Sequence, residues 1–205
     1  MIKNDLIKKI NDKSAIVGII GLGYVGLPLI IRFSEEKFKV IGFDIDTEKC
    51  RTLNSGESYI HHISTESIQI ALKNGFSATT NWEQISKVDC ILICVPTPLK
   101  INNIPDLQYI RNTLNSAQKF LRKGQLLILE STTYPGTTDE ELVPIVENMS
   151  FQIGDDFFIA YSPEREDPGN PEYSTRTIPK VVSGITEHCC ELADTLYQSI
   201  VDQTI

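Results

Sequence analysis

The chain has 205 residues, and its 27 Asp and Glu against 19 Lys and Arg give a formal net charge of −8 at pH 7, which argues against a nucleic acid or an anionic membrane as partner. A chain of this length can bury about 70% of its extended surface, which suits one α/β domain and is short for two. No apolar run approaches the roughly 20 residues of a membrane-spanning helix, and the start, MIKNDLIKKINDK, lacks the apolar core of a signal peptide, so we expect a cytoplasmic protein.

The first predicted element is a short amphipathic helix over residues 2–11, whose apolar side chains recur at helical intervals. These side chains are Ile2, Leu6, Ile7 and Ile10. We expect this extension, residues 1–13, to pack against a single domain that spans residues 14–205.

An apolar strand then breaks into G-L-G-Y-V-G, which opens a helix and is followed by a second apolar strand. Gly21 allows the tight strand-to-helix turn, Gly23 lets a pyrophosphate approach the backbone, and Gly26 lets the helix pack closely on the sheet. The free amides at the start of that helix face the phosphates. This order of elements predicts a dinucleotide-binding unit; the alternative is a strand-to-helix turn without a ligand.

The type of dinucleotide is predicted from an acidic residue at the end of the second strand. Asp44 lies 18 residues after Gly26 and directly follows the apolar run 39–43. A carboxylate at this place bonds the ribose hydroxyls of NAD, whereas the phosphate of NADP would meet Asp44 and Asp46, with Arg51 too far along the chain to hold it. We therefore expect NAD.

The alternation of apolar strands and amphipathic helices continues along the chain. Helices are expected at 46–54, 64–73, 106–121, 137–148 and 186–200, and strands at 76–79, 88–95, 125–130, 156–161 and in KVVSG, 180–184. Ser64 with Glu66 would open the second of these helices, and Thr137 or Thr138 would cap the fourth. The order predicts an α/β fold with a doubly wound, mostly parallel sheet of the Rossmann type.

In an open sheet of this kind ligands bind beyond the carboxyl ends of the strands, so the segments that follow the strands form one site. Those segments are GLGYVG, DID, VPTP, ESTTYPGTT and SPEREDPG. Pro96 and Pro98 would stiffen the backbone so that Thr97 faces the nicotinamide side, unless VPTP is an ordinary proline turn. Ser131 and Thr132 directly follow a strand, where their hydroxyls can bond the cofactor or orient a water.

Glu164, in S-P-E-R, is a carboxylate near the expected nicotinamide face and could act as a general base toward water. The alternative is a surface glutamate that pairs with Arg165. Metal chemistry has little support, because the five cysteines form no CxxC pair and His61-His62 has no identifiable partner ligands. Cys94 lies in an apolar strand beside the expected cofactor, which is a poor place for a reactive thiolate.

Taken together, the strings GLGYVGLPL, FDID with Lys49, VPTP, ESTTYPGTT and SPEREDPGN resemble the nucleotide-sugar 6-dehydrogenase family, over about Ala15 to Gly184. Members of this family oxidise UDP-glucose, GDP-mannose or UDP-N-acetylhexosamines to uronic acids. SPERxxPG followed by T-x-x-IPKVVSG is similar to the branch that acts on UDP-N-acetylglucosamine or a close relative, whereas the UDP-glucose branch has PEFLxEG there.

The resemblance implies a four-electron oxidation of the sugar C6 alcohol with two NAD, through a cysteine-bound thiohemiacetal and thioester. It implies that the pyrophosphate lies on Gly21, Tyr24, Val25 and Gly26, the adenosine ribose on Asp44 and Lys49, and the reacting centre beside Thr97 and Thr132. Thr132 would also position water, and Glu164 would be the base for thioester hydrolysis. The second glutamate of PEFLxEG falls on Pro168, so its role is absent, moved or taken by Glu166.

The family's catalytic cysteine, in a GG-x-C-x-P-x-D motif, and its lysine and asparagine lie in a later region that does not occur in these 205 residues. We therefore expect the amino-terminal NAD-binding domain of such an enzyme, which alone binds NAD without turnover. Intact members tend to form homodimers through the later helical region, so exposed apolar residues are expected near 186–205. A UDP-glucose 6-dehydrogenase domain, a non-catalytic NAD-binding module and a β-hydroxyacid dehydrogenase stay open as alternatives.

Overall fold

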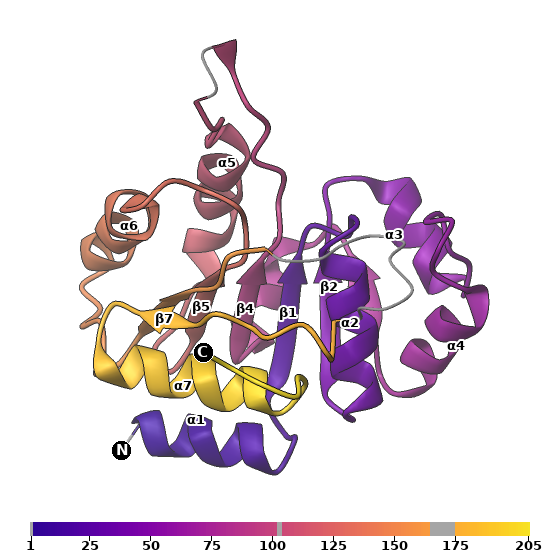
Figure 1. The fold of residues 1–205 in the computed structure, drawn as a ribbon, viewed down its shortest axis with the longest axis horizontal. Helices are drawn as coiled ribbons and strands as arrows, with labels where there is room; N and C mark the ends of the chain where they lie inside the picture. The colour runs from indigo at the N-terminus through magenta and orange to yellow at the C-terminus, as the bar shows by residue number, and fades with distance from the viewer. Residues whose placement is uncertain (1, 102–103, 165–174) are drawn as a thin grey trace.

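The computed structural model describes residues 2–101, 104–164 and 175–205, which form a seven-stranded sheet with helices on both faces (Figure 1). The strands are β1 (Ile16–Ile20), β2 (Lys39–Phe43), β3 (Ser77–Thr79), β4 (Cys90–Ile93), β5 (Leu126–Leu129), β6 (Phe158–Tyr161) and β7 (Ser183–Gly184). Their order is β3-β2-β1-β4-β5-β6-β7, and every pairing is parallel except that of β6 with β7. The predicted doubly wound, mostly parallel sheet is confirmed.

The helices join these strands and flank the sheet. They are α1 (Ile2–Asn11), α2 (Gly26–Glu35), α3 (Thr47–Asn54), α4 (Thr65–Lys73), α5 (Gln108–Ala117), α6 (Val143–Asn148) and α7 (Glu187–Gln198), with short 3-10 helices η1 (Trp82–Lys87) and η3 (Gln118–Phe120) and a π-helical turn η4 (Thr138–Leu142). The side chains of Asp46, Ser64 and Thr186 cap α3, α4 and α7 by accepting hydrogen bonds from first-turn amides.

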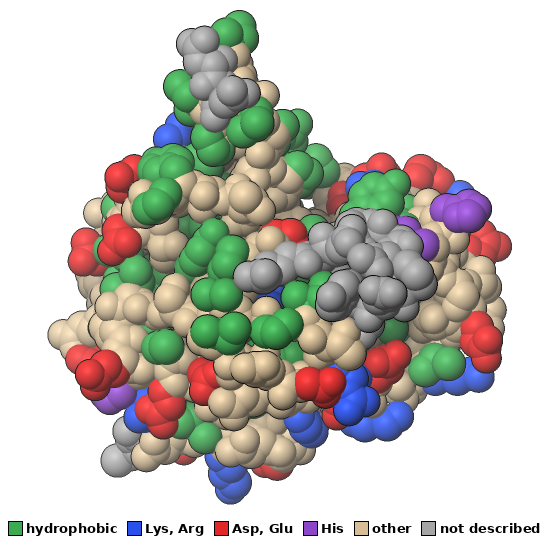
Figure 2. Space-filling view, viewed as in Figure 1, with side chains coloured by type: hydrophobic (Ala, Val, Ile, Leu, Met, Phe, Trp, Pro, Cys, Tyr) green, Lys and Arg blue, Asp and Glu red, His purple; other side chains and the backbone are tan. Residues whose placement is uncertain are grey.

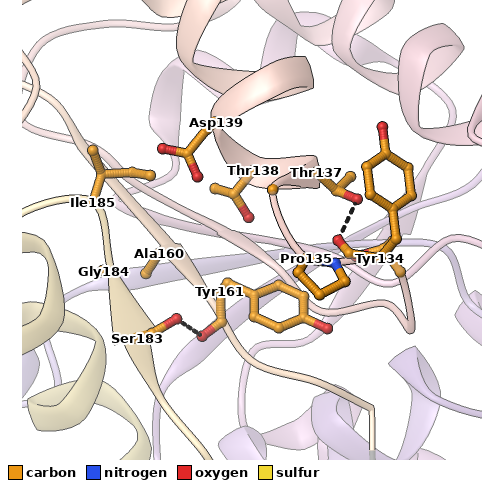
Figure 3. A pocket seen from close by; sticks show the side chains of 12 residues that line it. Tyr134, Pro135, Thr137, Thr138, Asp139, Ala160, Tyr161, Ser183, Gly184 and Ile185 are labelled. Atoms are coloured by element: carbon orange, nitrogen blue, oxygen red, sulfur yellow. Dashed lines mark hydrogen bonds between the residues drawn. The ribbon is translucent and has the colours of Figure 1, made fainter.

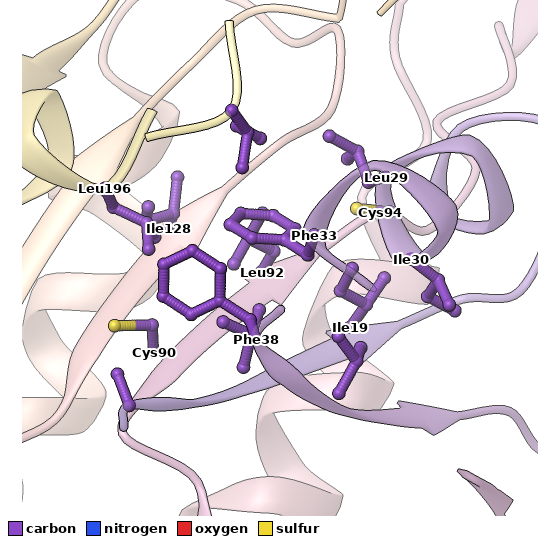
Figure 4. Packing of buried hydrophobic residues seen from close by; sticks show 14 of the residues in the cluster. Ile19, Leu29, Ile30, Phe33, Phe38, Cys90, Leu92, Cys94, Ile128 and Leu196 are labelled. Atoms are coloured by element: carbon purple, nitrogen blue, oxygen red, sulfur yellow. The ribbon is translucent and has the colours of Figure 1, made fainter. Parts of the chain in front are cut away.

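Two apolar cores lie on opposite faces of the sheet, because successive strand residues point to opposite sides. On β4, Cys90 and Leu92 join the core that α1, α2, α4 and α7 cover, whereas Ile91 and Ile93 join the core under α5 and α6. Figure 4 shows part of the first core, in which the aromatic rings of Phe33 and Phe38 meet edge to face at 5.5 Å. Burial on both faces explains why the central strands are continuous apolar runs.

Four details differ from the sequence prediction. The helix expected at 106–121 ends as α5 at Ala117 and continues as η3, and the helix expected at 137–148 begins with the wider turn η4. The segment that forms η1 was not predicted. The final strand is only Ser183–Gly184, because Lys180 and Val182 instead donate backbone hydrogen bonds to Gln203 and Ile205.

Exposed apolar side chains do not gather near 186–205 as expected. There α7 buries Cys189, Leu192, Ala193, Leu196 and Tyr197 against the sheet and α1, and only Ile205 is a large exposed apolar residue. They gather instead in the segment after β4, where Leu99 is 64%, Ile101 89% and Ile104 58% exposed. The described residues on either side of 102–103 belong to the part of the chain that projects from the body in Figures 1 and 2. Within the described ranges, no helix is long and apolar enough to cross a membrane.

Candidate functional site

A cleft of about 520 Å³ lies at the carboxyl ends of the parallel strands, where β1 separates β2 from β4 and the strand order reverses direction. Segments that follow β1, β2, β4, β5 and β6 all contribute to its lining. The predicted residues that line it are Gly21, Gly23, Tyr24, Val25, Asp44, Lys49, Pro96, Thr97, Ser131, Thr132 and Glu164. Gly26 lies behind the cleft wall, at the start of α2.

The three glycines of the turn have different spatial constraints. Gly21 has φ of +98°, and a Cβ there would lie 2.6 Å from the Cys94 carbonyl oxygen; a Cβ on Gly26 would collide with the Gly21 carbonyl oxygen. Gly23 has open space where its side chain would be. Gly21 and Gly26 are therefore required by the fold, whereas Gly23 leaves room for a ligand against the backbone. This turn at the start of α2 fits a pyrophosphate.

Asp44 is held in place by three groups around it. Its Oδ2 accepts a hydrogen bond from the Leu22 amide at 3.0 Å and lies 3.6 Å from Lys49 Nζ, and its Oδ1 accepts from the Asp46 amide at 3.0 Å. Each carboxylate oxygen keeps acceptor capacity for a further donor. Asp46 itself is engaged as the cap of α3, through the Glu48 and Lys49 amides. Of these two acids, Asp44 is thus the one that lines the cleft.

Sequence reasoning missed several residues beside this turn. Tyr59 and Ile60 line the cleft, and the Tyr59 hydroxyl donates a hydrogen bond to the Leu22 carbonyl oxygen. A second cavity of about 380 Å³ adjoins it and is lined by Ile45, Trp82 and Tyr109 as well as by Asp44 and Lys49. Trp82 could have been found only by predicting η1, which stacks its ring on that of Phe43 with the ring centres 6.1 Å apart, and Tyr109 comes from α5.

Hydrogen bonds join the segments that follow β4 and β5. Thr97 Oγ1 donates to the Thr132 carbonyl oxygen at 2.6 Å, and Ser131 Oγ donates to the Val95 carbonyl oxygen at 2.9 Å. Ser131 is buried, so its hydroxyl hydrogen is committed to this bond and it can offer a ligand only its oxygen and backbone. The Thr132 side chain lines the cleft.

The floor of the cleft contains a buried charged pair. Glu130, at the end of β5, accepts hydrogen bonds from Lys180 Nζ and from the Tyr197 hydroxyl. Burial tends to lower the pKa of the Lys180 ammonium, but the charge of Glu130 beside it outweighs this and raises it. Cys94 lies beside them, and burial followed by the charge of Glu130 raises the pKa of its thiol well above the ordinary value. Cys94 is therefore not suited to be a nucleophile.

Glu164 lines the cleft with one carboxylate oxygen buried, at the end of the described segment after β6. The residues that sequence reasoning considered beside it, namely Arg165, Glu166 and Pro168, lie outside the described residues. Within the described ranges, no group of three or more His, Cys, Asp or Glu side chains could hold a metal ion.

A third cavity, of about 430 Å³, lies beside β6 and β7 and is drawn in Figure 3. Residues 133–139 form one side of it, and Tyr161, Ser183 and Ile185 line the other. The expectation that Thr137 or Thr138 caps the following helix is wrong, because neither side chain bonds a first-turn amide. Thr137 Oγ1 donates instead to the Tyr134 carbonyl oxygen at 2.8 Å and so stabilises the loop (Figure 3).

Comparisons with known proteins agree with this geometry. Residues 15–201 match the model of the UDP-glucose/GDP-mannose dehydrogenase family, NAD binding domain. The chain is 38% identical over 186 residues to a UDP-N-acetyl-D-glucosamine 6-dehydrogenase of Pseudomonas aeruginosa, a match that covers 90% of this chain and 43% of that protein. It is 34% identical to a UDP-N-acetyl-D-mannosamine dehydrogenase of Pyrococcus horikoshii, over 90% of this chain and 44% of that protein.

Solved structures show the same likeness. A UDP-D-ManNAc dehydrogenase structure from Pyrococcus horikoshii superimposes with a TM-score of 0.86 at 31% identity, over 93% of this chain and 46% of that one. The chain spans less than half the length of these relatives.

Proposed function

Since this chain belongs to the UDP-glucose/GDP-mannose dehydrogenase family and matches its NAD-binding domain, we propose that it forms the NAD-binding part of an enzyme that oxidises the C6 alcohol of a UDP-N-acetylhexosamine, with UDP-N-acetylglucosamine the first choice, to the uronic acid. The convergence of the strand-end segments on one cleft at the reversal of strand order is the observation that carries this proposal.

The bound cofactor would lie along the cleft and the adjoining cavity. Its pyrophosphate would lie against Gly23, Tyr24 and Val25 at the start of α2, and its adenosine ribose against Asp44 and Lys49. The adenine would enter the cavity lined by Trp82 and Tyr109, whose aromatic faces suit a flat base. The nicotinamide would then lie beside Thr97, Ser131 and Thr132, with Pro96 behind it. When bound, NAD accepts a hydride from the carbon that is oxidised.

Glu164 and Thr132 are the residues to which we assign roles at the reacting end. Both line the cleft where we place the nicotinamide, so Thr132 could orient a water and Glu164 could remove its proton during hydrolysis of a thioester. We assign the thiol to a part of the enzyme outside these 205 residues, because Cys94 is the one cysteine among the described residues that line the cleft, and it is buried with a raised pKa. A homodimer of the complete enzyme is part of this proposal.

The cofactor half of the proposal is tested by calorimetric titration of the chain with NAD and then with NADP. Saturable binding of NAD, much weaker binding of NADP, and a loss of NAD affinity in Asp44→Ala would support it. Glu48→Ala is the matched control, because this exposed carboxylate on α3 pairs with Arg51 at 2.7 Å and does not line the cleft. Equal binding of NAD by Asp44→Ala would contradict the assignment of the ribose site.

The substrate half requires the complete gene product. It is assayed against UDP-N-acetylglucosamine, its galacto and manno epimers, UDP-glucose and small hydroxyacids, by the NADH formed per sugar consumed. Two NADH per UDP-N-acetylhexosamine, with a carboxylate product, is the expected result. A preference for UDP-glucose or for a hydroxyacid would show that the proposed substrate is wrong. Binding of NAD without oxidation of any of these compounds would identify a non-catalytic NAD-binding module. Light scattering measures whether the complete protein is a dimer.

A further inference from the structure

Tyr59 contacts the glycine turn from a distant part of the sequence. It lies between α3 and α4, lines the cleft, and donates its hydroxyl hydrogen to the Leu22 carbonyl oxygen, 37 residues earlier in the chain. Burial, followed by the charge of Asp44, raises the pKa of the Tyr59 phenol. The hydroxyl therefore stays protonated and remains a donor.

Leu22 is consequently held on both sides of its α-carbon. Its amide donates to Asp44 Oδ2 at 3.0 Å, and its carbonyl oxygen accepts from Tyr59. Because the peptide unit is planar and trans, fixing the Leu22 carbonyl also fixes the amide hydrogen of Gly23, which points the opposite way from that oxygen. No residue in the described ranges accepts a hydrogen bond from the Gly23 amide.

The surroundings of Gly23 and Tyr59 suit a role in ligand binding. Gly23 lines the cleft and has open space where a side chain would be. A hydrogen bond received by a carbonyl oxygen polarises its peptide and strengthens the amide of the same unit as a donor. Lys49 Nζ lies 5.9 Å from the centre of the Tyr59 ring and 3.6 Å from Asp44, so the ring is held beside the ribose-binding pair.

We propose that Tyr59 is a positioning residue of the cofactor site, whose hydroxyl aims and polarises the Leu22–Gly23 peptide so that the Gly23 amide binds the pyrophosphate of the dinucleotide. The proposal rests on the NAD-binding function assigned above. It gives the segment between α3 and α4 a task in phosphate recognition, through a residue that never has to touch the cofactor.

The first test compares Tyr59→Phe with the unchanged chain by calorimetry, using adenosine, ADP and NAD. The phenylalanine keeps the ring and removes one hydrogen bond, so ADP and NAD should bind about five- to tenfold more weakly. Adenosine lacks the phosphates and should bind with unchanged affinity. Tyr134→Phe is the matched control, because its hydroxyl also makes a side-chain hydrogen bond, to Glu140 at 2.6 Å, but lies outside the cleft.

The second test does not depend on the cofactor. In ¹⁵N-labelled chain without ligand, Tyr59→Phe should shift the Gly23 amide resonance and speed its hydrogen exchange, while Tyr134→Phe leaves both unchanged. If the Gly23 amide of Tyr59→Phe has the same resonance and exchange rate as in the chain without substitution, the proposal is wrong, whether or not the chain binds NAD. If the chain without substitution does not bind NAD, the proposed function is wrong. Loss of the folded state, or an equal loss of adenosine and ADP affinity in Tyr59→Phe, would show a structural role instead.

Discussion

The Thr97 hydroxyl donates a 2.6 Å hydrogen bond to the Thr132 carbonyl oxygen, and so links two of the segments that line the cleft. Both segments leave the sheet at neighbouring strand ends, of β4 and β5. The bond therefore holds together two parts of the lining beside which we propose that the nicotinamide lies.

Thr97→Val removes this bond with little change in volume. We expect NAD affinity to fall about three- to tenfold, because a typical hydrogen bond contributes about 0.5–1.5 kcal/mol. Calorimetry measures the affinity. Thr195→Val is the control, since its hydroxyl also donates to a backbone oxygen, that of Glu191 at 2.7 Å, but lies on α7 away from the cleft. Equal affinities of the two variants would show that the bond does not shape the site.

Gly23→Ala and Gly26→Ala should separate ligand binding from folding. A methyl group at Gly23 meets open space, so this variant should unfold at nearly the same urea concentration as the unchanged chain while its NAD binding falls at least tenfold. A methyl group at Gly26 meets the Gly21 carbonyl oxygen, so that variant should lose about 3 kcal/mol or more, or fail to fold. Undiminished NAD binding by Gly23→Ala would contradict the placement of the pyrophosphate.

Lys180→Met should be strongly destabilising, because it leaves the Glu130 carboxylate buried without its cation. Breaking a buried pair in this way costs about 3–5 kcal/mol. Urea unfolding measures the loss. Arg51→Met is the control, because Arg51 pairs with Glu48 at 2.7 Å with both side chains exposed, and its removal should cost under about 1 kcal/mol. Adding Glu130→Gln to Lys180→Met should recover part of the loss, and a loss as small as the control's would contradict the account.

Asp89 should make the stability of the domain depend on pH in the acid range. Burial tends to raise its pKa, but hydrogen bonds from the Ile16 amide, Lys9 and Arg122 outweigh this and lower it. A carboxyl whose pKa is lowered by folding stabilises the protein at pH values above the pKa of the unfolded chain, 3.8. That contribution is lost as the pH falls through the lower pKa of the folded protein. Asp89→Asn should therefore lower the free energy of unfolding by about 2 kcal/mol at pH 7 and make it depend less on pH in the acid range.

The measurement for Asp89 is the urea midpoint of both proteins from pH 7 down to pH 2. The difference between them should be constant near neutrality and shrink below about pH 4. A difference that stays constant over the whole range would mean that the carboxyl is not ionised preferentially in the folded protein.

The sequence predicts those features of this molecule that depend on local chemistry. The apolar runs that alternate with helices predict the strands and their parallel arrangement. The glycine turn and Asp44 can be predicted because their constraints act within some 25 residues of sequence. Strand-end topology then gathers Thr97, Thr132 and Glu164 into one region.

The features that could not be predicted depend on contacts between distant segments. Tyr59 donates a hydrogen bond to Leu22, Trp82 stacks on Phe43, and Lys180 pairs with Glu130. No periodicity or motif in the sequence predicts any of these contacts. The sequence predicts too long a final strand for a similar reason, because residues 180–182 bond to residues 203–205 and do not extend β7. The sequence likewise predicts that the Ser131 hydroxyl is available to a ligand, whereas in the structure this hydroxyl donates to the Val95 carbonyl oxygen.

The central position of β1 has a consequence for how the domain forms during synthesis. Its two neighbours are β2 and β4, and β4 begins 70 residues after β1 ends, so β1 waits for one of its partners until a much later part of the chain has been made. Parallel strands pair only after the connection between them is complete, which makes such sheets slow to assemble. The cleft also needs the segments after β5 and β6, so a nascent chain has a nearly finished sheet before it can bind its cofactor. NAD can stabilise the completed domain but cannot guide the early steps of its folding.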